Sequence, residues 1–427
     1  MRTRWILVGL AVLGVASWLS LDNIGSPEAV VKSPQRRLAF EGALGYGRYT
    51  IGGRGGRVYE VTTLEDNDQP GSLRHALNQP EPRIVRFKVS GIIMLQKPLT
   101  ISKGHLTVEG QTSPVGIVVA GAPVKVSADQ VILRYLRFRP GSFGYVGDGL
   151  EARGTRDVII DHCSMSWSVD EAGSFYNNTN FTLQNSIVSN SLSDSSHPKG
   201  KHGYGGIWGG NNASFVRNII GNHTSRTPRI NGHRLESPYP EEAEFVEVVN
   251  NVIYNWGRNN VYGAEDGALD LLNNFYLPGH DSECVHFLDI FLPLSSAPDI
   301  FISGNLYHGK PEWNEDNIAG VVARNAQEEP EPIDPSDSRL SSSPRGGTLP
   351  TLEARENFRR IIGGRRAGAN KNAAGFFLDS VDRQLYDQIE QTMAGQPPAG
   401  ILNHETDQIT SWQAYAREFA SPIQPSD

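Results

Sequence analysis

Five short segments that align on one asparagine decide the fold: Gln184-Asn185-Ser-Ile-Val, Arg217-Asn218-Ile-Ile, Asn250-Asn251-Val-Ile-Tyr, Asn273-Asn274-Phe-Tyr and Gly304-Asn305-Leu-Tyr. The aligned asparagines are Asn185, Asn218, Asn251, Asn274 and Asn305, and His162 occupies the equivalent point one unit before Asn185. Short β-rich segments that recur at a shortest period of about 23, some lengthened by insertions, are typical of a solenoid and not of a sandwich.

The physical chemistry of a stacked coil explains why asparagine recurs. A coil of three short strands cannot bury its own inner face, so neighbouring coils must stack on it. An asparagine at the same turn of each coil donates to one neighbour and accepts from the other, and it tolerates a left-handed backbone. We therefore interpret Asn185 to Asn305 as a structural ladder, and we expect the insertions to form loops on one face, where solenoids carry their function.

Composition narrows the class of partner. The chain has 427 residues with a formal charge of −8, and its hydrophobic fraction of 38% is enough for a packed core. The negative charge disfavours nucleic acid as a partner, whereas a local basic patch still permits an anionic substrate. No disulfide framework is available, since the only cysteines are Cys163 and Cys284, which we expect to be free.

The N-terminus predicts export. Arg2 and Arg4 precede an uncharged, mostly apolar stretch that ends before Asp22. Residues 1–21 are therefore predicted to be a signal peptide, with an uncleaved N-terminal anchor as the alternative. We expect a secreted protein, either extracellular or periplasmic.

The remaining chain divides by composition. Residues 38–310 are assigned to the solenoid, with a short capping helix near residues 71–77. Residues 327–350 are rich in Pro, Ser, Glu and Asp and predict a linker or long loop. Residues 351–427 form a C-terminal extension that we expect to pack back on the solenoid, because Leu385, Ile389 and Met393 recur at helical spacing.

Two acidic clusters lie about one coil apart. Asp148 follows a glycine, and Asp170 and Glu171 form a pair close to one period later. Stacking would bring Asp148 and Asp170 within about one strand spacing, roughly 4.8 Å between backbones. Carboxylates so close repel one another unless a hard cation neutralises them, and calcium accepts such oxygen ligands. Solvated turn acids and the paired carboxylates of a glycosidase are the alternatives.

A basic cluster follows in the next insertions. Arg226 and Arg229 flank Thr-Pro, and Lys199 and Lys201 lie in the preceding insertion. If consecutive insertions share one face, these side chains surround a common groove with the acids. Arginine suits carboxylate recognition because its planar group bonds in a bidentate manner.

At this point the sequence resembles the pectate lyases of polysaccharide lyase family one, over roughly residues 38 to 310. The motifs that carry the resemblance are Ala39-Phe-Glu-Gly-Ala43, Gly52-Gly-Arg-Gly-Gly56, Pro70-Gly-Ser-Leu-Arg74, Ile160-Asp-His-Cys-Ser-Met-Ser-Trp167, His197-Pro-Lys-Gly200, His202-Gly-Tyr-Gly-Gly-Ile-Trp-Gly209, Arg226-Thr-Pro-Arg229 and Val249-Asn-Asn-Val252. The resemblance implies an all-β, right-handed parallel β-helix and a calcium cofactor.

The same resemblance implies roles for individual residues. Asp148 and Asp170 match calcium ligands, Arg226 the catalytic arginine and Arg229 a substrate-binding arginine. Where the family often has a further calcium carboxylate, this chain has Ser174, so Glu171 is the expected substitute. Where a substrate-binding lysine often stands, this chain has Tyr204, so Lys199 or Lys201 is expected to serve instead. A third family arginine is replaced by Asn231, with Arg234 nearby.

These roles imply a β-elimination on polygalacturonate that leaves a 4,5-unsaturated uronate end. The protein is expected to be a monomer, without nucleic-acid or protein partners. Three alternatives stay open. A glycoside hydrolase on the same fold would use carboxylates about 5 to 9.5 Å apart and no calcium. A non-catalytic solenoid would bind polysaccharide without cutting it, and a pectin lyase would act on the methyl ester without calcium.

Overall fold

The computed structural model describes residues 36–195, 197–234, 236–292, 298–325, 327, 329–340 and 349–420. The predicted signal peptide or anchor at residues 1–21 lies outside these residues, as do residues 341–348 of the predicted linker. Among the described residues, no helix combines the length and the apolar character needed to span a membrane. Contacts group residues Leu38–Asp427 into one compact unit.

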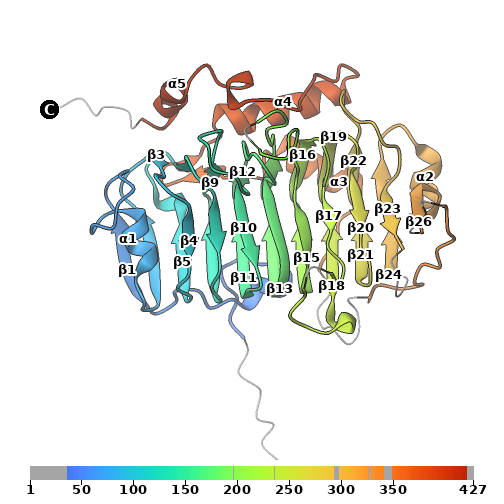
Figure 1. Ribbon diagram of the computed structural model, residues 1–427, viewed down its shortest axis with the longest axis horizontal. Coiled ribbons are helices and arrows are strands. Elements are labelled where there is room, and N and C mark those ends of the chain that lie inside the picture. Colours follow the sequence, from blue (N-terminus) through green and yellow to red (C-terminus); the bar gives the residue numbers. More distant parts are fainter. Residues whose placement is uncertain are drawn as a thin grey trace, which may run out of the picture. The chain divides into compact units, whose positions relative to one another are not determined.

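Parallel strands stack coil upon coil along this unit (Figure 1). One face is a sheet of nine strands among the described residues. These are β3 (Gly91–Met94), β6 (Ile117–Ala120), β9 (Arg137–Arg139), β12 (Ser164–Met165), β14 (Ile187–Ser189), β16 (Ile219–His223), β19 (Val252–Trp256), β22 (Phe275–Leu277) and β25 (Leu306–Tyr307).

The other two faces join into a sheet of 17 described strands. One row is β4 (Leu99–Ile101), β7 (Val124–Val126), β10 (Leu150–Arg153), β13 (Gly173–Gln184), β15 (Ile207–Val216), β17 (Arg229–Ile230), β20 (Val261–Gly263), β23 (Leu288–Phe291) and β26 (Val321–Arg324). The other row is β1 (Arg57–Val61), β2 (Arg83–Phe87), β5 (Leu106–Glu109), β8 (Val131–Arg134), β11 (Arg156–Asp161), the far ends of β13 and β15, β18 (Phe245–Val249), β21 (Ala268–Leu272) and β24 (Asp299–Ser303). The predicted right-handed parallel β-helix is confirmed.

The core runs along the axis, because equivalent positions of successive coils stack in register. One such row passes through Val158, Phe181, Val246 and Leu269, all buried. Alternate residues of each strand face inward, so every coil adds one apolar layer. Cys163 belongs to this core, and both cysteines are free thiols, as the sequence predicts.

The asparagine ladder exists, but it lies one residue away from Asn185. The side chain of Asn218 donates to Asn251, and Asn251 donates to Asn274, at 3.0 Å in each case. Ser186 occupies the equivalent point one coil earlier, since its N–H donates to Asn218 Oδ1 at 2.9 Å. The assignment of Asn185 to the ladder is therefore wrong: Asn185 has φ 49° and forms the left-handed corner just before the ladder position.

A second ladder lies at the next corner. Asn222 donates to Asn190 at 2.7 Å, and Asn255 donates to Asn222 at 2.8 Å. All three residues have positive φ, between 41° and 59°. The amides of the first row also bond backbone groups, as where the Asn218 side chain donates to the Leu183 carbonyl at 3.0 Å, and both rows give buried polar groups partners at consecutive corners.

Helices and a hairpin complete the unit. They are α1 (Leu73–Asn78), α2 (Pro311–Glu315), α3 (Ala354–Gly363), α4 (Ser380–Met393), α5 (Trp412–Ala416), the 3₁₀ turns η1 (Tyr46–Tyr49), η2 (Gly110–Thr112), η3 (Glu241–Ala243), η4 (Asn317–Gly320), η6 (Glu405–Asp407) and η7 (Arg417–Phe419), and the antiparallel pair β27 (Lys371–Asn372) and β28 (Gly375–Phe376). Helix α1 forms where the sequence predicts a short helix, and Ser72 caps it by accepting from His75 N–H.

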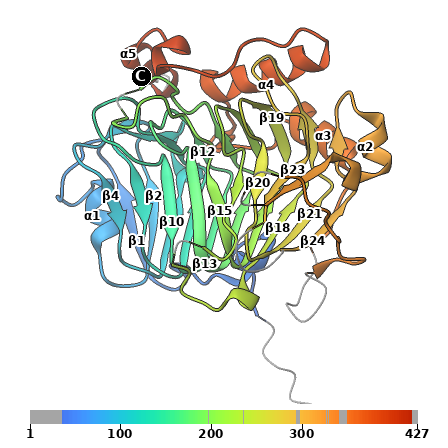
Figure 2. The same cartoon turned by 45° about the vertical axis from the view of Figure 1, so that its right-hand side comes forward.

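The C-terminal helices cover the nine-stranded sheet. Helix α4 runs over the strands of this sheet (Figures 1 and 2). Its residues Leu385 and Ile389 pack in one cluster with Ile187, Ile219 and Val252. Buried charges attach the same segment: Arg139 lies 3.2 Å from Asp379 and 2.7 Å from Asp382.

The described part of the linker region is also held to the β-helix. Ser336 N–H donates to the Ile300 carbonyl at 2.7 Å, and the Arg339 guanidinium lies 3.3 Å from Glu247.

Candidate active site

The two predicted acidic clusters lie on adjacent coils, at the turns that lead into β10 and β13. Leu150 pairs with Gly173, so Asp148 lies opposite Glu171 and Asp170 is displaced by one position. Glu171 N–H donates to Asp148 Oδ1 at 3.3 Å. The structure brings all three predicted acids together: each contributes an oxygen that lies within 4.8 Å of the others.

In the acidic group, which is Asp148, Asp170 and Glu171, burial and mutual repulsion disfavour the charged form of Asp148. Burial, followed by the charges of Asp170 and Glu151, raises the pKa of Asp148 well above its usual value. Glu171 is buried, whereas the Asp170 side chain is 26% exposed, so the group is open on one side. Three clustered carboxylates are the hard oxygen ligands that calcium prefers, so the residues present fit that ion.

Arg226 reaches back across one coil to the acidic group. Bridges between Glu171 and Tyr204, and between Tyr204 and Ser225, set these turns side by side. The guanidinium of Arg226 lies over the Tyr204 ring, 4.5 Å from its centroid, and forms an ion pair with Glu171. The residue has φ 58°, so the chain turns sharply where this side chain leaves it.

Arg229 begins β17, three residues after Arg226 in the same coil. Its guanidinium forms an ion pair with Glu265 and lies over the rings of Tyr262 and Phe291, at 4.9 and 5.6 Å. Arg234 is close enough that burial and then the charge of Arg229 lower its pKa to about 10. The aromatic faces hold Arg229 in place by cation–π contact.

Lys199 and Lys201 lie in the loop before β15 and do not join the acidic group. Both are exposed, and Lys201 lies 4.0 Å from Asp194. Within the parts of the chain that the structure describes, neither lysine forms an ion pair with Asp148, Asp170 or Glu171.

Two histidines belong to this site although their spacing in the sequence gives no metal-ligand signal. His197 and His202 stack with ring centroids 3.7 Å apart. Their Nε2 atoms lie 3.8 and 3.4 Å from the Asp170 carboxylate, so Asp170, His197 and His202 form a second group with the spacing of metal ligands. Burial, and then the charge of His197, lower the pKa of His202. The fold of the loop between them creates this proximity, which no helical or strand period would reveal.

Comparison of the sequence with known proteins identifies the family of the chain. No family model matches the chain. A probable pectate lyase C of Neosartorya fischeri is 32% identical over 396 residues, covering 87% of this chain and 81% of the relative. A probable pectate lyase C of Emericella nidulans is 37% identical over 263 residues, covering 60% of this chain and 57% of the relative. The chain therefore belongs to the pectate lyase family.

Several of these relatives are longer than the matched region: the chain spans 57% of the length of the Emericella nidulans protein. Among solved structures, the cedar pollen allergen Jun a 1 aligns with a TM-score of 0.48 and 17% identity, over 76% of this chain and 92% of that one. A Bacillus sp. N165 pectate lyase in complex with trigalacturonate aligns with a TM-score of 0.47 and 16% identity, over 77% and 98% of the two chains.

Proposed function

We propose that this protein is a secreted, calcium-dependent pectate lyase that cleaves α-1,4-polygalacturonate by β-elimination and releases 4,5-unsaturated products. The observation that carries the proposal is the convergence of Asp148, Asp170 and Glu171, from two adjacent coils, with Arg226, which reaches them past the Tyr204 turn. Family membership supports the same activity.

Asp148, Asp170 and Glu171 would hold the calcium ion. When bound there, calcium supplies positive charge that stabilises the substrate carboxylate as negative charge develops beside C5. The like-charge repulsion among the three acids is the physical reason for a cation at this point. The acids lie at the turns of adjacent coils, and the exposed part of Asp170 leaves the group open to a polymer that lies across the coils.

Arg226 would remove the C5 proton, and the electrons of the C5–H bond would form the double bond between C4 and C5. The C4–O4 bond would break with its electron pair on O4, which would take a proton from water. Free arginine has a pKa above about 12, so it acts as a base only in surroundings that favour its neutral form. The ion pair with Glu171 opposes this, and it must be broken before proton transfer. Glu171 therefore has two competing partners, the arginine and the cation, and its transfer to the cation would release Arg226.

Arg229, three residues after Arg226 in the same coil, would bind a substrate carboxylate. Its planar group is already oriented by Tyr262 and Phe291, and Glu265 is the partner that the substrate would displace. Lys199 and Lys201, exposed in the adjacent loop, would contribute long-range attraction for the polyanion. We further propose that residues 1–21 direct export and that the protein acts as a monomer.

The test is the ultraviolet absorbance of the conjugated uronate released from polygalacturonate, first with calcium and then with a chelator. We expect absorbance that rises only with calcium and is abolished by Arg226→Ala. Arg258→Ala is the matched control, because Arg258 is exposed and lies in the next coil outside the acidic group. New reducing ends without this absorbance would establish a hydrolase instead. If neither signal appears while the protein still binds the polymer, it is a binding solenoid and the proposal fails.

A further inference from the structure

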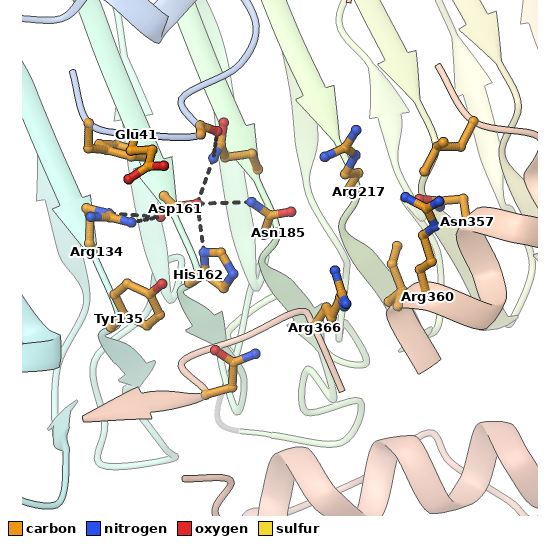
Figure 3. A pocket seen from close by; sticks show the side chains of 16 residues that line it. Glu41, Arg134, Tyr135, Asp161, His162, Asn185, Arg217, Asn357, Arg360 and Arg366 are labelled. Atoms are coloured by element: carbon orange, nitrogen blue, oxygen red, sulfur yellow. Dashed lines mark hydrogen bonds and ion pairs between the residues drawn. The ribbon is translucent and has the colours of Figure 1, made fainter. Parts of the chain in front are cut away.

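A polar cavity lies at the other end of β13 from the acidic group. Its volume is about 440 Å³. The corners that follow β8, β11, β13 and β15 form its floor, and α3 with the following loop forms one wall (Figure 3). The acids precede Gly173, where β13 begins, whereas this cavity follows Gln184, where it ends. The proposed catalytic chemistry therefore uses none of its residues.

One wall of this cavity is cationic. Arg217, Arg360 and Arg366 gather there, from the corner after β15, from α3 and from the loop after α3 (Figure 3). Arg360 pairs with Glu356, but the described residues provide no acidic partner for Arg217 or Arg366. Arg217 Nε is buried and has no hydrogen-bond partner. Burial, and then the charges of Arg360 and Arg366, lower the pKa of Arg217, so the wall lacks a counter-charge.

On the opposite side of the cavity the charge of Asp161 is already neutralised, and the Glu41 carboxyl is the other acid in the lining. The Asp161 carboxylate accepts from Arg134 Nε and Gln184 Nε2 at 2.8 Å and from Asn185 Nδ2 at 3.1 Å, and it lies 2.8 Å from His162 Nδ1. These contacts, with the charges of His162 and Arg134, hold the pKa of Asp161 well below its usual value despite burial. An anionic group therefore meets positive charge without a paired acid at the end with Arg217 and Arg366, whereas the end with Asp161 and Glu41 suits uncharged hydroxyls.

The same side of the cavity also offers groups suited to hydroxyls. Tyr135 stacks on His162 with ring centroids 4.8 Å apart, which fixes both rings at the cavity edge. The side chains of Asn185, Asn370 and Glu41 line the same space. A ligand that matches this arrangement carries an oxyanion at one end and hydroxyl groups at the other. Inorganic phosphate matches only the cationic end.

We propose that this cavity is a non-catalytic binding site for a sugar acid, whose carboxylate pairs with Arg217, Arg360 and Arg366 and whose hydroxyls face Asn185, Tyr135 and Glu41. Its volume falls within the range of about 300 to 1,000 Å³ that small-molecule sites occupy. Paired guanidinium groups bind carboxylates by charge-assisted, bidentate hydrogen bonds. The site would hold a uronate unit without positioning it for elimination.

The experiment is calorimetric titration of the full chain at low ionic strength with three probes: galacturonate, glucose and inorganic phosphate. Each of the single variants Arg360→Ala and Arg366→Ala should weaken galacturonate binding by about tenfold. Both positions are exposed, so these variants avoid the folding risk of Arg217→Gln. Arg359→Ala on the same helix is the matched control, because Arg359 is exposed and does not line the cavity.

The expected result is galacturonate binding that exceeds binding of both other probes, weakens in the two cavity variants and is unchanged in Arg359→Ala. Lyase activity on polygalacturonate should stay unchanged in all three variants, which separates this proposal from the proposed function. Glucose binding as strong as galacturonate binding would overturn carboxylate recognition. Phosphate binding as strong as galacturonate binding would overturn the assignment to a sugar acid. Galacturonate binding that survives in both cavity variants but is lost in Arg229→Ala would place the only site in the catalytic groove.

Discussion

Glu244 provides a test of how burial controls the stability of this β-helix. The residue follows η3 and is 1% exposed, and its carboxyl accepts from Tyr239 Oη at 2.6 Å and from Gly210 N–H at 3.0 Å. Burial outweighs these donors and raises the pKa of Glu244 from 4.5 to about 8. Between these two values the unfolded chain has released the proton and the folded protein still holds it. Stability contributed by the neutral acid is therefore complete below pH 4.5 and is lost as pH rises to about 8.

The magnitude follows from the same interval. At about 1.4 kcal/mol per pH unit the interval corresponds to at most about 5 kcal/mol, and relaxation around the buried charge reduces it to about 2 to 5 kcal/mol. Glu244→Gln removes the titration, so the free energy of unfolding of the variant, relative to the parent, should rise by this amount between pH 5 and pH 9. Urea unfolding at both pH values measures it, with the exposed neighbour in Glu242→Gln as control. Parallel changes in the parent and in Glu244→Gln would refute the reasoning.

Three further outcomes follow from contacts elsewhere. Asp148→Asn should raise the calcium concentration needed for half-maximal absorbance change by at least about tenfold, since the site loses a charged oxygen ligand; an unchanged calcium titration would remove Asp148 from the site. Asp379→Asn should lower the free energy of unfolding by about 3 to 5 kcal/mol in urea, because Arg137 is left buried without its counter-charge and Arg139 keeps only Asp382; a change below about 1 kcal/mol would contradict this. Asn251→Ala should cost about 3 kcal/mol in the same assay, because its ladder neighbours lose buried partners, and a neutral effect would show that the ladder adds no stability.

The spacing of residues in the sequence was enough to predict a solenoid of stacked coils, because each coil must return to the same corner, and the family resemblance then implied the parallel β-helix. It could not fix which residue of a pair forms that corner. Asn185 and Ser186 are adjacent, and only the backbone shows that Asn185 takes the left-handed turn while Ser186 meets Asn218. The second ladder escaped prediction because Asn190, Asn222 and Asn255 share no flanking motif.

In the candidate site, too, the sequence predicted the facing residue with an error of one position. The spacing of the two acidic clusters suggested that Asp148 faces Asp170, whereas the strand register places Asp148 opposite Glu171. The carboxylates still converge, because adjacent side chains at a turn remain within a few ångströms. His197, His202 and Glu265 join the site through loop conformation, which sequence spacing does not encode. The separate roles of Asp148, Asp170 and Arg226 remain predictions for the experiments above.

The position of Glu171 follows from the geometry of stacking. Coils are fixed at about 4.8 Å by their hydrogen bonds, so charges at equivalent turns cannot move apart to relieve repulsion. A carboxylate there must find positive charge, and Glu171 has a guanidinium on one side and two carboxylates on the other. In the structure its partner is Arg226; under the proposed function it would instead bind a cation together with Asp148 and Asp170. Because the coil spacing is fixed, cation binding would break the ion pair between Glu171 and Arg226. The proposed base would then be available only when the proposed cofactor is in place.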